Sequence, residues 1–302
     1  MSFIIGKSWA GNSELNFSVT PIANNIYSII APSYGLPTPE NQGWNSNSYF
    51  VVTDTGVLVF DTGSSELIGE EIKRVIKSVT DKPVRWVVNS HSHADHWLGN
   101  AAFTQSETDV ELIASKASLA TMKTDGQPSA DFFFKVTKGA TGQSHIKYPT
   151  ALVSKSEKRN LGGVDIEFIF SNDGHSPGDI MMWLPKQKII FGGDVLNSQW
   201  MPILIDHGNV ENLISSLHQV TKLSPKIVLP GHGKATTVKS VKRDADLLSQ
   251  MIKQVKIAKQ SDKSRDEVLA LVKAKLAPEY SSQYKNFDAG IKQQVSELYQ
   301  QY

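Results

Sequence analysis

Hydrophobic and polar positions in the first hundred residues follow the period of a strand and then that of a helix. Two runs rich in Val, Phe and Tyr within residues 49–61 flank a turn-like sequence at 53–56, which predicts a β-hairpin. A helical period follows, and Ser64 or Ser65 can provide its N-cap. The apolar face of this helix comprises Leu67, Ile68, Ile72, Val75, Ile76 and Val79. Residues 84–88 are again apolar and β-type, so the order predicted is hairpin, helix, strand.

The second half of the chain repeats this order. Strand patterns occur at residues 164–170, 180–184 and 188–191, a helical pattern begins at about Asn209, and a further strand is predicted at 227–229. Strands followed by a helix and a strand in each half favour two sheets packed face to face with helices outside. We therefore expect an α/β sandwich with its functional groups at strand ends.

Composition changes at about Val238, where Lys, Asp, Gln, Leu and Ala become frequent. This predicts a catalytic domain over residues 1–237 and a helical tail over 238–302 that packs on it, with breaks near residues 261–262 and at Pro278. Segments rich in Gly, Ser, Asn and Gln predict long loops at residues 41–48, 124–130 and 138–150, and loops of this length often cover a site.

The overall charge narrows the range of partners. The chain has 31 basic and 30 acidic residues, a net charge of +1, so no strong field attracts it to nucleic acid or to an anionic membrane. No apolar run is long enough to span a bilayer. We expect a soluble protein that acts on a small molecule, cytoplasmic by default and periplasmic if the chain is a processed form. The oligomeric state is left open.

The chain has no cysteine, so nitrogen and oxygen must supply any metal ligands. His91, His93, Asp95 and His96 fall within six residues directly after the strand predicted at 84–88. Neutral imidazole and carboxylate suit Zn²⁺. The alternative is a solvated polar loop. However, three histidines and an aspartate would rarely fall so close together by chance in a chain with only eight histidines.

Three more candidate ligands follow strands of the second half. They are His175 in Gly174-His175-Ser176-Pro177-Gly178-Asp179, Asp194 after Gly192-Gly193, and His232 between Gly231 and Gly233. Glycine lets the backbone turn sharply or approach a crowded centre, as ligands from distant strands require. Each motif alone is weak, whereas together with the first cluster they predict a metal centre.

This ordered set resembles the metallo-β-lactamase superfamily, whose pattern is His-x-His-x-Asp-His followed by a His, an Asp and a final His at strand ends. The resemblance covers roughly residues 47–234 and implies an αββα sandwich, here with a C-terminal helical extension. By position, it implies that His91, His93 and His175 bind one metal, that Asp95, His96 and His232 bind a second, and that Asp194 bridges both. Asp61 matches the family's Asp-x-Gly strand end, where it would orient a ligand; alternatively it caps the following helix.

The resemblance implies a hydrolase with two zinc ions, with iron or manganese as alternatives. A hydroxide that bridges the metals would attack the carbonyl of an ester, thioester, lactone or lactam, and Asp95 would hold or relay the proton. Weak β-lactamase activity and an iron-dependent oxidoreductase of the same fold are the alternatives. A non-catalytic binding module would be expected to have lost ligands, and all seven are present.

The wider sequence context is similar to the zinc metallohydrolases of quinoprotein relay systems and to glyoxalase II-like members. In this family the segment after Asp194 passes near the metals, which makes His207 a candidate substrate contact. Trp44 and Trp200 are either pocket wall or core. His145 lies in a predicted loop that can line a pocket, and His218 is expected on a helix surface.

Overall fold

Two β-sheets form the centre of the fold in the computed structural model, which describes residues 15, 17–32, 35–104, 109–171, 173–204 and 208–302. In the described residues, the first sheet has the order β1-β2-β3-β4-β5-β6-β7 and the second the order β12-β11-β10-β9-β8. The strands of the first sheet are β1 (Val19–Ala23), β2 (Ile26–Ile29), β3 (Ser48–Val52), β4 (Val57–Phe60), β5 (Val84–Val88), β6 (Glu111–Ser115) and β7 (Ala151–Val153). Those of the second are β8 (Glu157–Leu161), β9 (Val164–Phe170), β10 (Ile180–Leu184), β11 (Ile189–Phe191) and β12 (Ile227–Leu229).

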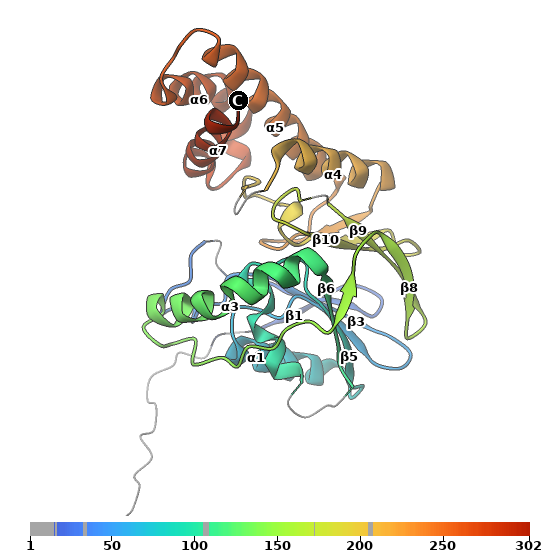
Figure 1. The fold of residues 1–302 in the computed structure, drawn as a ribbon. Helices are drawn as coiled ribbons and strands as arrows, with labels where there is room; N and C mark the ends of the chain where they lie inside the picture. The colour runs from blue at the N-terminus through green and yellow to red at the C-terminus, as the bar shows by residue number, and fades with distance from the viewer. Residues whose placement is uncertain (1–14, 16, 33–34, 105–108, 172, 205–207) are drawn as a thin grey trace, which may run out of the picture.

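Helices cover the outer face of each sheet, which confirms the αββα sandwich (Figure 1). On the first sheet lie α1 (Glu66–Val79), the short α2 (Ala94–Trp97), the 3-10 helix η1 (Leu98–Phe103) and α3 (Lys116–Val136). In the second sheet, strand β11 is followed by the 3-10 helix η2 (Gly193–Val195), and α4 (Val210–Leu223) covers the sheet. The C-terminal extension contains α5 (Val238–Lys259), α6 (Arg265–Tyr280), the 3-10 helix η3 (Ser281–Gln283) and α7 (Phe287–Gln301).

Strand periodicity explains how the first sheet is buried on both faces. In β4, Val57 and Val59 pack against α1, whereas Leu58 and Phe60 point toward the second sheet and meet residues such as Phe191. Alternate side chains of a strand point to opposite faces, so a strand covered on both sides is apolar throughout. The apolar run that predicted a strand therefore also reflects its place in the middle layer.

Helix α1 follows the sequence pattern closely. The Ser65 side chain accepts a hydrogen bond from the Ile68 backbone N–H at 3.3 Å, so Ser65, of the two candidates, is the N-cap. Ile68, Ile72, Val75 and Ile76 are buried against the first sheet, as predicted. Leu67 is the exception, because 37% of it is exposed.

The predicted loop at residues 124–130 is wrong, because these residues belong to α3. Gly126 packs so closely on the Trp97 ring that an added Cβ would lie 2.9 Å from it, and Met122 and Phe133 are buried in the same small cluster. Gly126 and Pro128 both disfavour a helix, so tertiary packing must stabilise the helical conformation of this segment. Of the other two predicted loops, 138–150 contains neither helix nor strand, and 41–48 contains neither until Ser48, where β3 begins.

The C-terminal helices share a hydrophobic cluster with α4 and the second sheet. Leu217 of α4, Leu248 of α5 and Ile291 of α7 all belong to it. The break predicted at residues 261–262 is confirmed, whereas Pro278 lies inside α6, which ends two residues later at Tyr280. No helix in the described ranges has the length and apolar character needed to cross a membrane.

Candidate metal centre

The strand ends of both sheets deliver the seven candidate ligands to one place. The first four follow β5, two of them before α2 and two within it, while His175 lies between β9 and β10. Asp194 lies in η2 after β11, and His232 follows β12. Strands β4, β5, β11 and β12 form parallel pairs whose carboxyl ends reach the same edge. This topology explains how His96 and His232, which are 136 positions apart in the sequence, can approach one another with ring centroids 5.4 Å apart.

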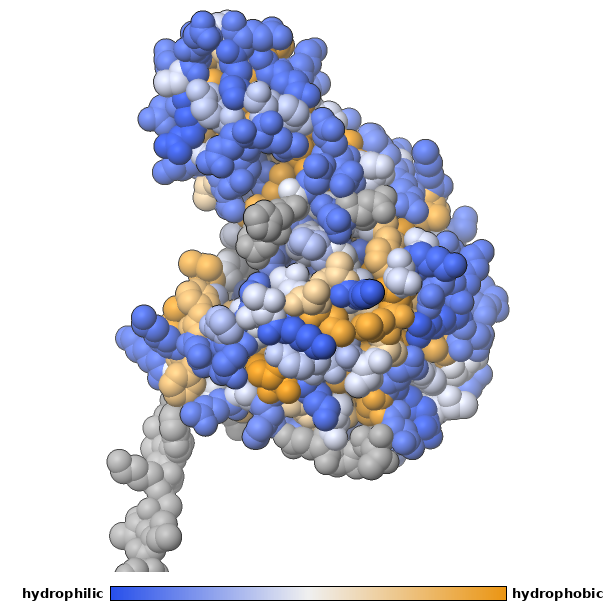
Figure 2. Space-filling view, in the orientation of Figure 1, coloured by the Kyte–Doolittle hydropathy of each residue, from blue (hydrophilic) through white to orange (hydrophobic). Residues whose placement is uncertain are grey.

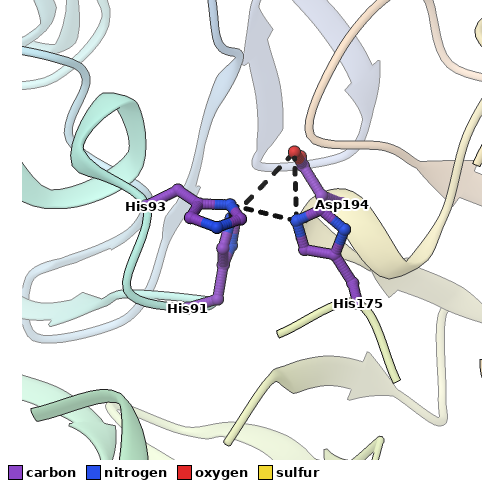
Figure 3. Close-up of side chains that lie close together, drawn as sticks. All are labelled: His91, His93, His175 and Asp194. Atoms are coloured by element: carbon purple, nitrogen blue, oxygen red, sulfur yellow. Dashed lines mark hydrogen bonds and ion pairs between the residues drawn. The ribbon is translucent and has the colours of Figure 1, made fainter. Parts of the chain in front are cut away.

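Four side chains form the first group: His91, His93, His175 and Asp194 (Figure 3). Nδ1 of His93 lies 2.9 Å from Nε2 of His91 and 3.1 Å from Nε2 of His175. Oδ2 of Asp194 lies 3.7 Å from Nε2 of His175 and 4.0 Å from Nε2 of His91. Three imidazole nitrogens and a carboxylate oxygen therefore face one small volume.

Asp95, His96 and His232 form the second group. Oδ2 of Asp95 lies 3.5 Å from Nε2 of His96 and 3.6 Å from Nε2 of His232. Asp194 reaches this group too: its Oδ1 is 3.3 Å from Nε2 of His96, and its Oδ2 is 3.2 Å from Nε2 of His232. Its carboxylate thus lies between the two groups.

Hydrogen bonds on the outer side of the rings orient four imidazoles. Nδ1 of His175 donates to the Ile203 carbonyl at 2.7 Å, and Nδ1 of His232 donates to the Asn45 carbonyl at 2.7 Å. A carbonyl oxygen accepts but cannot donate, so both rings carry their proton on Nδ1 when neutral. Their Nε2 lone pairs consequently point inward, as metal ligation requires.

Asp61 orients the other two rings. Its Oδ2 accepts from Nδ1 of His96 at 2.9 Å and from the Ser90 hydroxyl at 2.8 Å, and its Oδ1 accepts from the Ser90 backbone N–H at 2.8 Å. The Ser90 oxygen is then free to accept from Nδ1 of His91, 2.8 Å away. Ser65, not Asp61, caps α1, so the geometry favours the orienting role over helix capping.

Negative charge dominates the second group. Burial lowers the pKa of His96, but Asp95, Asp194 and Asp61 outweigh burial and raise it to about 10. Burial raises the pKa of Asp194, yet His232 and His96 hold it well below its usual range, so this carboxylate is ionised. At His91, burial and the neighbouring His96 and His93 keep the pKa well below its ordinary value. The cluster thus combines the ionised carboxylate of Asp194 with an imidazole, that of His91, that stays neutral.

Two buried polar atoms are placed where they could bind a cation. Nε2 of His96 and Oδ1 of Asp194 have no hydrogen-bond partner among the described residues, although both are buried. An orphaned buried polar atom costs about 1–3 kcal/mol, so such atoms call for a ligand. Unprotonated ring nitrogens about 3 Å apart also repel unless a proton or a cation lies among them. The donor set of five imidazoles and two carboxylates therefore fits divalent ions such as Zn²⁺.

Asn45 is a residue of the site that sequence reasoning missed. Its side-chain amide donates to Oδ2 of Asp95 at 3.2 Å, while its backbone carbonyl accepts from His232. It is 7% exposed and lines the cavity beside the cluster. It lies in the predicted loop 41–48, where nothing in the sequence distinguishes it from its polar neighbours. Ser90 was missed likewise, although its position directly before His91 was a signal.

A cavity of about 710 Å³ opens beside the two groups. Its walls come from residues 35–37, from α3, from the segment after Asp194 and from α7, and its floor includes His93, Asp95, Asp194 and His232. Figure 2 shows this face hollowed between the helical tail and the body of the molecule, with hydrophobic side chains on the lower margin. The metal centre is therefore accessible from a partly enclosed space.

The residues that the sequence suggested as substrate contacts lie in different parts of the structure. Trp200 lines the cavity. Trp44 does not line it. Of the two alternatives left open for this residue, the structure has the core: Trp44 is 2% exposed and stacks on Phe17 with ring centroids 3.7 Å apart, in the core under α1. His207 lies outside the described residues. His145 is an exposed side chain paired with Glu66 at 2.8 Å, and His218 is exposed on α4, as expected.

The chain is similar to proteins of one known family. A family model described as the metallo-beta-lactamase superfamily matches residues 41–232. The metallo-beta-lactamase IND-1 of Chryseobacterium indologenes is 23% identical over 234 residues, covering 76% of this chain and 87% of that protein. The probable metallo-hydrolase YqgX of Bacillus subtilis is 25% identical over 196 residues, covering 64% of this chain and 87% of that protein.

Solved structures show the same fold. A metallo-beta-lactamase from Pontibacter korlensis superposes with a TM-score of 0.60 at 22% identity, covering 77% of this chain and 99% of that one. The inverting sec-alkylsulfatase Pisa1 from Pseudomonas sp. gives a TM-score of 0.70 at 15% identity, covering 95% of this chain and 50% of that one. The chain thus spans about half the length of the sulfatase. Because 95% coverage must include most of residues 238–302, the likeness to the sulfatase extends into the helical tail.

Proposed function

The chain belongs to the metallo-beta-lactamase superfamily and is a metal-dependent hydrolase, and from this premise we propose that it uses two zinc ions to hydrolyse a small carbonyl substrate. In this proposal His91, His93 and His175 hold one ion, and Asp95, His96 and His232 hold the other. The substrate is an ester, a thioester, a lactone or a lactam.

The position of Asp194 is the observation that carries the proposal. Its two carboxylate oxygens lie 3.2–4.0 Å from ring nitrogens of both groups, and one of them is buried without a hydrogen bond. A carboxylate so placed can serve two cations at once. When bound, such ions supply Lewis acidity, which lowers the pKa of an adjacent water and polarises the scissile group.

Asp95 is our candidate for handling the proton. Its side chain is 13% exposed, faces the cavity and is held by the Asn45 amide. A carboxylate at the boundary between the cluster and the cavity can accept a proton from the attacking water and pass it to the leaving group. Ser90 hydrogen-bonds Asp61 and His91 on the outer side of the rings, and it does not line the cavity. The chemistry needs no serine nucleophile.

Metal analysis together with a substrate panel tests the proposal. The protein is purified without added metal, its metals are counted, and the zinc-loaded form is assayed on lactone, thioester, ester, phosphoester and β-lactam substrates. About two zinc ions per chain and turnover of a carbonyl substrate are expected. One iron per chain with no hydrolysis would instead favour an oxidoreductase. Preferential turnover of a β-lactam would assign lactamase activity.

A further inference from the structure

The cavity beside the metal centre lies between α3 and α7, a helix of the C-terminal extension. Asn286, Ala289, Gly290 and Gln293 on or just before α7 line one side. Across from them, α3 contributes Ser129, Phe132 and Phe133. The extension is therefore part of the cavity wall.

Direct contacts fix α7 relative to the metal centre. The Met201 backbone N–H donates to Oδ1 of Asn286 at 2.8 Å, and the Lys285 N–H donates to the Gln199 carbonyl at 2.8 Å. Gly290 packs on Met201 so closely that an added Cβ would lie 2.9 Å from its Cβ. Met201 belongs to the segment that leads away from Asp194, so α7 is held at a defined place above the site.

Away from the metal ligands, the lining is largely apolar. It includes Leu36, Pro37, Phe132, Phe133, Trp200 and Ile203. Leu36 is 77% exposed and Phe132 is 48% exposed, which leaves large apolar side chains open to solvent at this cavity. Exposed apolar side chains that converge on a catalytic cavity indicate an apolar ligand.

Charge excludes one class of ligand. Among the described residues that line the cavity there is no Lys or Arg, and the carboxylates are those of Asp95 and Asp194 in the metal centre. A substrate with an anionic group far from the metals would bury that charge without a cationic partner, which is costly. The cavity therefore suits a neutral chain better than an anionic one.

We propose that the substrate is a neutral ester with an apolar acyl chain, that this chain lies between α3 and α7, and that Ala289 of α7 limits its length. The inference deepens the proposed function and rests on it for the position of the ester group. Ala289 is exposed and lines the cavity, so a larger side chain there fills space that the chain would occupy.

The first test is a chain-length series of p-nitrophenyl esters from acetate to decanoate, assayed with the zinc-loaded 302-residue chain. Each buried methylene is expected to raise kcat/KM by up to about fourfold until the cavity is filled. In Ala289→Trp, the ratio of kcat/KM for decanoate to that for acetate is expected to fall at least about tenfold. An ester whose acyl chain ends in a carboxylate should be hydrolysed about tenfold more slowly than the neutral ester of equal length.

Lys292→Trp is the matched control, because Lys292 is exposed on the same helix and does not line the cavity. It introduces the same ring at a different face and should leave the decanoate-to-acetate ratio unchanged. An equal fall of this ratio in both variants, or a flat chain-length series in the parent protein, would overturn the inference.

A binding measurement separates this inference from the proposed function. The neutral fluorescent probe N-phenyl-1-naphthylamine is bound to the chelator-treated 302-residue chain and displaced with 1-decanol or with ethanol. Displacement by decanol at much lower concentration than by ethanol, weakened in Ala289→Trp, supports the apolar chain site even if no ester is hydrolysed. Hydrolysis of esters without any preference for decanol in displacement would retain the proposed function and reject the chain site.

Discussion

Nδ1 of His96 lies 2.9 Å from Oδ2 of Asp61, and both side chains are buried, with at most 1% exposed. The same Asp61 oxygen accepts from Ser90, which in turn contacts His91. One buried carboxylate therefore orients an imidazole in each of the two ligand groups. Partners of this kind fix the tautomer and strengthen the ligand, and their loss weakens metal binding.

Replacement of this carboxylate should weaken metal binding. In Asp61→Asn, we expect zinc affinity to fall about 10- to 100-fold, because the amide carries no charge to pair with the His96 N–H. The backbone at Asp61 has a φ of +61°, which Asn tolerates better than most residues do, so the fold should persist. Competition with a chromogenic chelator measures the affinity. Asp165→Asn, an exposed carboxylate on β9, is the control, and an equal affinity loss in both variants would contradict the orienting role.

Asn45 should affect turnover more than metal content. In Asn45→Ala, the backbone carbonyl that orients His232 remains, whereas the amide that holds Asp95 is lost. We expect kcat to fall about tenfold while zinc content stays near that of the parent protein. Single-turnover kinetics and metal analysis on the same sample check this. Asn160→Ala on the distant β8 is the control, and loss of zinc in Asn45→Ala would show that the amide supports metal binding instead.

Asp194 should be essential to both metals. Asp194→Asn keeps the shape of the side chain but removes the charge that lies between the two groups. We expect fewer zinc ions per chain and a fall in kcat/KM on the order of a thousandfold, since several kcal/mol of Lewis-acid stabilisation would be lost. Metal analysis and the carbonyl substrate panel measure both. Retention of full metal content and activity would rule out a bridging carboxylate.

Some parts of the site were predictable because ligand chemistry leaves a local signal. His91, His93, Asp95 and His96 follow a strand in a spacing that few other functions require, and the structure brings them together with the three later residues. Asn45 has no such signal, because its role depends on a loop that packs against the site from 46 positions before His91. Whether Trp44 lies in the pocket wall or in the core could not be predicted for a related reason: sequence does not show which face of a loop is buried.

The fold was predictable where apolar periodicity is strong. Strand β4 and helix α1 carry clear patterns, and both were found at the expected positions. Strands β1 and β8 were not predicted: β1 contains Pro21, and β8 has the polar sequence EKRNL at the edge of its sheet. Edge strands need little apolar character, so they resemble loops. The middle of α3 was likewise predicted as a loop, because it contains Gly126 and Pro128.

Asp244 on α5 gives the fold a pH dependence that is independent of the metal centre. Its Oδ1 accepts from the Tyr284 hydroxyl at 2.6 Å and from Arg243, while its Oδ2 is buried without a partner among the described residues. Arg243 also donates to the Ser198 carbonyl, which ties this cluster to the segment that lines the cavity. Burial raises the pKa of Asp244 to about 7, although Arg243 and Tyr284 oppose the shift.

The sign of the effect follows from this raised pKa. Between the ordinary value of 3.8 and about 7, the folded protein keeps a proton that the unfolded chain releases, so stability falls as the pH rises. Between pH 5.5 and pH 8, Asp244 should remove roughly 2 kcal/mol of stability. The Asn side chain of Asp244→Asn resembles the neutral acid and does not titrate, so the variant should not lose this stability. The free energy of unfolding of the variant minus that of the parent protein should therefore increase by roughly 2 kcal/mol from pH 5.5 to pH 8. Urea unfolding of both proteins at the two pH values, with chelator present so that the ligand histidines titrate equally in each, measures this difference. A difference that stays constant with pH would show that Asp244 is already ionised in the fold at pH 5.5.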